Sequence, residues 1–241
     1  MSSTVFVNPY MFVSGAPTPP SSSLSVVASR AEAMTATASP SFTVVGYTPV
    51  ENDLVVLWNA STTSATLATV GSGWVNVLGG TNISTPADGT VAVACLAHVV
   101  TASEQSANTN SWTLTNLWNV TETGETIVVV VRGADPLNPI DSAAAAFNAS
   151  PVTPHVLAGL TGTDLETGSL VMSGVFPDAM GTYSAPVGWA SVSATTAVNQ
   201  GGEVFSRTDA TLAGVDVTAT NVVPSASDEY ASITVAVKVA P

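Results

Sequence analysis

Short runs of alternating apolar and polar residues, separated by Gly, Pro, Asn and Asp, follow one another along most of the chain. This period of two predicts β-strands, because successive side chains of a strand point to opposite faces of a sheet. Ile127 to Val131 is continuously apolar and therefore predicts a central strand covered on both faces. The strands predicted in the first half lie within residues 23–29, 41–48, 52–60, 89–103, 110–120 and 125–133.

One segment interrupts this pattern and predicts a short helix. Residues 138–150 contain four consecutive alanines after Asp141 and Ser142, either of which could cap the first turn. Pro151 would end the helix. We therefore expect one or two helical turns between two strand-rich regions.

The order of motifs in the first half recurs in the second half. Residues 168–176 resemble residues 52–60, and the pair Gly188-Trp189 corresponds to Gly73-Trp74. Further on, "TATN" at 218–221 corresponds to "TLTN" at 113–116, and "SITVAVK" at 232–238 corresponds to "TIVVVVR" at 126–132. Four matches in the same order indicate two duplicated halves, at about residues 43–135 and 160–241.

These features predict an all-β protein with a β-sandwich body over residues 24–241. Two architectures fit duplicated halves of this size: one large sandwich of jelly-roll type, or two small sandwiches in tandem. A single double-sheet body is the preferred prediction, because the connection between the halves is apolar rather than rich in flexible linker residues.

The first 23 residues differ from the body. They combine Phe6, Tyr10 and Phe12 with a Pro- and Ser-rich segment, a composition that favours an extended backbone. They have no basic region and are interrupted by Pro9, so they do not predict a signal peptide. We expect an N-terminal arm whose three aromatic side chains anchor it in a groove of the same chain or of a neighbouring one.

The charge balance excludes some classes of partner. The 241 residues include only four Lys or Arg against seventeen Asp or Glu, for a formal net charge of −13. Such a chain can neutralise few phosphates, so we expect it to bind neither nucleic acid nor an anionic membrane surface. No run of eighteen apolar residues predicts a membrane span. Because charged residues are so sparse, much of the surface must be Ser, Thr, Asn and Ala, which suits a subunit of an assembly.

No pattern of reactive residues predicts catalysis, a metal site or a bound cofactor. The two histidines, His98 and His155, lack the spacing of a zinc site, and Cys95 lies among apolar residues that indicate a buried thiol. Asp164 and Glu166 are predicted to be solvated loop acids rather than a glycosidase pair. Nucleophile-elbow, calcium-loop and phosphate-loop motifs do not occur. We therefore expect a protein that is not an enzyme.

The tryptophans are the remaining candidates for binding. Trp112 and Trp118 would share one face of an unbroken strand, and Trp58 would share a face with Leu54 and Val56. Exposed tryptophans could stack on sugar rings. Packing in the core or against another subunit is the more common use of such residues.

Four segments give the chain a family resemblance: "ENDLVVLWNAS" (51–61), "GSGWVNVL" (71–78), "VVVVRGADPLNPID" (128–141) and "ASITVAVKVAP" (231–241). Together they resemble the β-sandwich virion proteins of tailed actinobacteriophages, of the minor tail or head-decoration type. The resemblance covers about residues 43–240 and includes no catalytic residue. It implies a structural protein of the phage particle, with other virion proteins as partners.

Three functional hypotheses follow. The preferred one is a minor tail or tail-tip protein that assembles through its arm, as a homo-oligomer for which a trimer is one arrangement. The second is a head-decoration protein that stabilises the capsid. The third is a carbohydrate-binding or host-adhesion module that recognises a glycan of the host surface.

Overall fold

The computed structural model describes residues 23–63, 65–85, 90–160, 165–178, 182–194, 201–208, 220–225 and 227–241. This part of the chain is built almost entirely from antiparallel sheets, as the alternating pattern predicts. The predicted arm, with Phe6, Tyr10 and Phe12, lies outside the described residues apart from Ser23.

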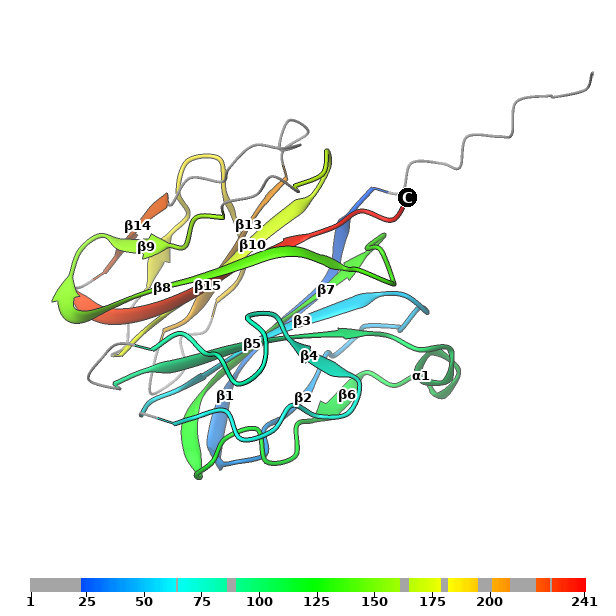
Figure 1. The fold of residues 1–241 in the computed structure, drawn as a ribbon, viewed down its shortest axis with the longest axis horizontal. Coiled ribbons are helices and arrows are strands. Elements are labelled where there is room, and N and C mark those ends of the chain that lie inside the picture. Colours follow the sequence, from blue (N-terminus) through cyan, green and yellow to red (C-terminus); the bar gives the residue numbers. More distant parts are fainter. Residues whose placement is uncertain are drawn as a thin grey trace, which may run out of the picture.

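Two five-stranded sheets form the body of the protein (Figure 1). The first contains, in spatial order, β1 (Ser25–Thr37), β7 (Glu122–Arg132), β3 (Leu54–Ser61), β5 (Ala92–Val99) and β4 (Trp74–Asn76). The second contains β8 (Ile140–Val152), β15 (Asp228–Val237), β10 (Leu170–Pro177), β13 (Glu203–Thr208) and β12 (Ala190–Ala194). Each large sheet is thus made from one half of the chain.

Two small sheets accompany the large ones. β2 (Ser41–Thr43) pairs with β6 (Ser111–Thr113) in the first half. In the second half β14 (Thr220–Pro224) lies between β9 (His155–Leu157) and β11 (Tyr183–Ser184). Apart from the additional β11, the two halves therefore have the same strand order. The matching order begins at β1 in the first half and at β8 in the second, earlier in the chain than residues 43 and 160, where the sequence motifs begin to match.

The register and the turns of the two halves also agree. Leu54 pairs with Val131 in the first large sheet, and Leu170 pairs with Val237 in the second. Gly73 and Gly188 have φ values of 80° and 81°, which glycine adopts without steric cost. In each case the next residue is a buried tryptophan whose backbone N–H donates to the carbonyl three residues earlier. The two Gly-Trp pairs are therefore equivalent turns.

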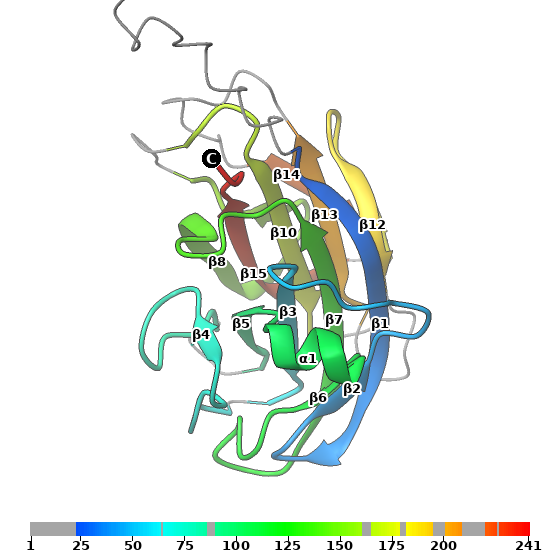
Figure 2. The same cartoon turned by 90° about the vertical axis from the view of Figure 1, so that its right-hand side faces the viewer.

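The two large sheets pack face to face around a shared core (Figure 2). Alternate residues of β3 (Leu54, Val56 and Trp58) join Leu170 and Met172 of β10 in one buried cluster. The Trp58 Nε1–H donates to the Ile233 carbonyl oxygen at 3.0 Å and so links β3 to β15 across the core. This arrangement confirms a β-sandwich formed by antiparallel sheets.

Each large sheet buries its outer face as well. Val55 and Leu57 of β3 belong to a second cluster with Phe42 of β2 and Trp112 of β6. In the other half, Val171 of β10 belongs to a third cluster with residues of the sheet β11-β14-β9. Because both faces of β3 and β7 are covered, their sequences are nearly continuous apolar runs, as predicted for Ile127 to Val131.

The predicted helix at 138–150 is wrong, because this segment forms the edge strand β8. Its alanines, Ala143 to Ala146, pair with residues Val235 to Ser232 of β15. Alanine has a high intrinsic helix propensity, but the free edge of β15 offers a ladder of backbone hydrogen bonds that outweighs it. The pairing with β15 therefore decides the structure of this segment.

The helix in the described residues is α1 (Ala102–Ala107), in a region expected to be the end of a strand. It begins at Thr101, whose side chain accepts from the Glu104 backbone N–H, while the Glu104 carboxylate accepts from the Thr101 N–H. This reciprocal capping box stabilises a very short helix. In the described part of the chain, no helix is long and apolar enough to cross a membrane.

Candidate functional site

The three tryptophans proposed as binding residues are buried. Trp58 is in the central core, and Trp112 and Trp118 are in the cluster on the outer face of the first large sheet. Trp118 Nε1–H donates to Asn59 Oδ1 at 2.6 Å. The unbroken strand expected from Trp112 to Trp118 is not present, since β6 ends at Thr113 and Trp118 forms a separate bridge with Leu67. None of the three rings forms an exposed stacking platform.

His98 lies on β5, held between an aromatic ring and an acid. Its Nδ1 is 2.8 Å from the Gly73 carbonyl oxygen, and its Nε2 is 2.9 Å from Glu104 Oε1. The imidazole stacks on Trp74 with a ring separation of 5.0 Å. Both ring nitrogens have hydrogen-bonding partners within the chain, so these contacts hold the imidazole in place against β4 and α1.

Glu104 connects His98 to the helix and to the aromatic cluster. Partial burial alone would raise the pKa of this carboxyl group, but hydrogen bonds from Thr101 and Trp112, together with His98, outweigh burial and lower the pKa. The Trp112 Nε1–H donates to Glu104 Oε1 at 3.0 Å. Glu104 therefore fastens α1 to β5 and β6 as a carboxylate.

His155, the other histidine, is fully buried at the start of β9. Its Nδ1 is 2.9 Å from the Tyr183 hydroxyl and its Nε2 is 3.1 Å from the Asp228 carbonyl oxygen. The ring stacks on Tyr230 at 4.3 Å. Burial disfavours the charged imidazolium and lowers the pKa of His155 below the ordinary value of 6.5.

This lowered pKa predicts a pH-dependent contribution to stability. Below about pH 6.5 the unfolded chain protonates His155 more readily than the folded chain does, so the free energy of unfolding should fall as the pH falls. Urea unfolding at several pH values between about 7.5 and 5 should show this loss, and His155→Gln should show a smaller one. Burial raises the pKa of carboxyl groups such as Glu203, so they also contribute to the pH dependence of stability. Their contribution is the same in both proteins and cancels when the two pH profiles are compared. Parallel pH profiles for the two proteins would contradict the prediction.

Basic residues at the ends of β7 and β15 pair with acids of the same chain. Arg132 makes two hydrogen bonds to buried Asp53, with Nε to Oδ1 at 2.8 Å and Nη2 to Oδ2 at 2.7 Å. In the second half Lys238 Nζ lies 2.6 Å from Glu166 Oε1. Glu166 is exposed, as expected for a solvated loop acid, and also forms this ion pair, while Asp164 lies outside the described residues. Both pairs fasten the end of a central strand to the turn before its neighbour.

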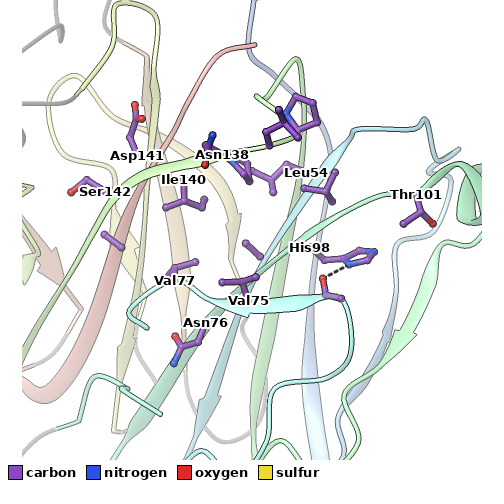
Figure 3. Close-up of a pocket in the computed structure, with 17 residues that line it drawn as sticks. Leu54, Val75, Asn76, Val77, His98, Thr101, Asn138, Ile140, Asp141 and Ser142 are labelled. Atoms are coloured by element: carbon purple, nitrogen blue, oxygen red, sulfur yellow. Dashed lines mark hydrogen bonds between the residues drawn. The ribbon is translucent and has the colours of Figure 1, made fainter. Parts of the chain in front are cut away.

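A pocket of about 650 Å³ lies between the two large sheets at one side of the sandwich (Figure 3). Its walls come from β4, β5 and the segment 136–143, which joins β7 to β8 and begins β8. Apolar lining residues include Leu54, Val75, Val77, Val99, Leu137 and Ile140. Polar groups at the lining are those of Asn76, His98, Thr101, Asn138, Asp141 and Ser142.

The pocket has the size and composition of a site for an apolar ligand or peptide. Figure 3 shows Val75 and Val77 on one side of it, with Ile140 and Asn138 on the other. Asp141 is the acid in its lining; burial raises the pKa of this carboxyl group, although Lys238 acts in the opposite direction. Since no other carboxyl group occurs among these lining residues, the pocket carries little charge on a strongly acidic protein.

The sequence pattern does not predict this pocket. Its lining comes from segments far apart in the chain, and the pattern of residues 138–143 favours a helix instead of the strand that borders the pocket. Cys95 lies in the central core rather than in the pocket, and burial raises the pKa of its thiol, as expected for an inert cysteine. Among the described residues, no group of three His, Cys, Asp or Glu side chains is placed to hold a metal ion.

Comparison with known proteins gives no assignment. The chain matches no protein-family model, no curated protein and no solved structure.

Proposed function

We propose that this chain is a non-enzymatic structural protein of a tailed bacteriophage particle, in the tail or tail tip, which assembles through its N-terminal arm. Its location is then the virion and its partners are other virion proteins and further copies of itself. The proposal combines the family resemblance with the surface that the fold leaves open.

The observation that carries the proposal is the long edge strand β8. It has thirteen residues, and Asp141 at its second position is its only charged residue. Proteins that remain monomeric commonly protect edge strands with charges, because an open row of backbone N–H and C=O groups pairs with other chains. Phe147 is 53% exposed on the same strand. An alanine-rich edge with a single charged residue and an exposed aromatic residue suits contact between subunits.

The segments that carry the resemblance form the framework of the sandwich. Residues 51–61 include β3, residues 71–78 include the Gly-Trp turn and β4, and residues 231–241 include most of β15. Within each half the chain passes repeatedly between a large and a small sheet, as in jelly rolls. We therefore infer that the body consists of two duplicated, jelly-roll-like halves.

The chemistry of the buried reactive groups supports a role without catalysis. Both nitrogens of His98 and of His155 have hydrogen-bonding partners, and Cys95 is buried in the central core. The glycan-binding alternative has less support, because Trp58, Trp112 and Trp118 are buried. Head decoration differs from the tail proposal only in the place the protein would occupy.

Deleting residues 1–20 should abolish incorporation of the protein into particles and leave the body folded. The measurement is mass spectrometry of purified particles produced from the genome that encodes the chain, with circular dichroism of the purified variant. Normal incorporation of the deletion variant would contradict assembly through the arm. Particles without the full-length protein would overturn the virion assignment, and a map showing it on the capsid would favour head decoration.

A further inference from the structure

The pocket lies where the two sides of the sandwich differ. On one side β1 lies against β12, and Ser29 Oγ donates to the Val192 carbonyl oxygen at 3.1 Å (Figure 2). On the other side, Ser84 Oγ makes the corresponding contact with the Ala146 carbonyl oxygen on β8 at 3.0 Å. Before Ala146, however, the first residues of β8 and residues 75–77 form opposite walls of the pocket.

Two sheet edges border this opening. β4 is the outermost strand of the first large sheet, and β8 is the outermost strand of the second. An extended segment in the pocket could therefore add backbone hydrogen bonds to an edge while its apolar side chains contact Val75, Val77 and Ile140. The pocket has the features of a receptor for a strand with large apolar side chains.

The arm has a complementary composition. Residues 1–23 contain no Asp, Glu, Lys or Arg, so all the charged side chains that give the net charge of −13 lie in residues 24–241. Residues 5–13, "VFVNPYMFV", contain three aromatic and three valine side chains. An uncharged apolar segment can approach an acidic body without like-charge repulsion, and the weakly charged pocket is where its burial costs least.

The place where the arm leaves the body is close to the pocket. A Cβ atom added to Gly133 would lie 2.7 Å from the Ser23 carbonyl oxygen, so Ser23 passes directly over Gly133. Three residues later, Pro136 begins the segment that lines the pocket. About nine residues separate Val13 from Ser23, which gives a reach of roughly 30 Å when extended. Pro17, Pro19 and Pro20 favour an extended backbone in this linker, a composition that suits a segment reaching a neighbouring subunit.

We propose that the pocket between β4 and β8 receives residues 5–13 from the arm of a second copy of this chain. The inference rests on the proposed function, which takes the arm to a neighbouring subunit. The arm adds to a sheet edge, and its aromatic side chains fill the apolar part of the pocket. Since each copy carries both an arm and a pocket, the contact can link successive subunits or close into a ring.

Self-association of the full-length chain tests the proposal. Light scattering after size-exclusion chromatography, over a range of protein concentrations, should show concentration-dependent oligomers. Val75→Asp puts a charge at the pocket wall and should weaken association about tenfold or more, because the charge is desolvated when the arm binds. Val75 is 65% exposed, so the substitution spares the core; Val223→Asp, at a residue 61% exposed on β14, is the matched control and should associate normally.

Phe12→Asp tests the other side of the contact and should weaken association as Val75→Asp does. A peptide of residues 3–15 should dissociate the wild-type oligomer, and it should bind Val75→Asp at least about tenfold more weakly than it binds Val223→Asp. Thermal unfolding of each variant verifies that the body is folded. A wild-type chain that is monomeric at every concentration, or Val75→Asp oligomers as stable as wild type, would overturn the inference.

The same variants separate this inference from the proposed function. Val75→Asp should be depleted from purified particles, as the deletion of residues 1–20 should be. If the deletion variant is lost from particles while Val75→Asp is incorporated normally, the arm has a different receptor and the pocket proposal fails. In that case assembly through the arm would stand.

Discussion

Replacing Trp58 with alanine should lower the free energy of unfolding by about 4 kcal/mol, within the range of roughly 3–5 kcal/mol for large-to-small changes in a core. Trp58 is fully buried at the centre of the cluster shared by the two large sheets. Its removal leaves a cavity between β3 and β10 and takes the indole donor away from the Ile233 carbonyl oxygen. Both effects act on the contact between the halves.

Urea unfolding followed by circular dichroism measures this loss. Trp58→Phe keeps most of the apolar contact but not the hydrogen bond, so it should lie between wild type and Trp58→Ala. If Trp58→Ala costs less than about 1 kcal/mol, the two sheets do not share the core that the structure describes.

The second large effect is expected at Gly174, which faces Trp58 across the core. A Cβ atom at Gly174 would lie 2.6 Å from Trp58 Cδ1 and 2.9 Å from Cγ and Nε1. Alanine normally stabilises a strand relative to glycine by roughly 0.5–1 kcal/mol. Here the clash with a fully buried indole should reverse the sign, and Gly174→Ala should destabilise the protein by about 1–3 kcal/mol.

A double-mutant cycle identifies the cause. In a Trp58→Leu background the added methyl group has room, so Gly174→Ala should cost little, with a coupling of about 1–2 kcal/mol between the sites. Gly71→Ala is the matched control, because a Cβ there would meet Trp74 and Leu114 at ordinary distances of 3.5 and 3.6 Å. Equal costs of Gly174→Ala in both backgrounds would contradict the clash.

The sequence predicted the central strands well because their pattern leaves few alternatives. Residues 52–60 and 125–133 largely coincide with β3 and β7, whose apolar runs reflect burial on both faces. The Gly-Trp pairs were informative for a similar reason, since the positive φ at Gly73 and Gly188 favours a residue without a Cβ. In these places local sequence and tertiary structure favour the same conformation.

Where local sequence preference and tertiary structure favour different conformations, the sequence alone predicts the structure poorly. The alanines of β8 have a helical preference, and only the free edge of β15, far along the chain, makes them a strand. The signal for α1 was present as Thr101 and Glu104, but these residues follow the strand pattern directly. The pocket depends on how β4 and β8 lie opposite each other, which no local pattern encodes.

The tryptophans show a related difficulty. Alternation places Trp58 on the same face as Leu54 and Val56, which the central cluster confirms. It does not say whether that face meets solvent, a ligand or a second sheet, because all three give a period of two. The packing of the two halves against each other buries this face, so Trp58, a candidate binding residue, is a core residue.

Trp58 and Gly174 are each the fifth residue of an eight-residue strand, in corresponding strands of the two halves. The largest and the smallest side chains thus occupy one position of the repeat, on opposite sides of the same contact. The two strands are therefore sterically complementary and cannot replace each other: two copies of β3 would put two indoles in the space of one, and two copies of β10 would leave that space empty.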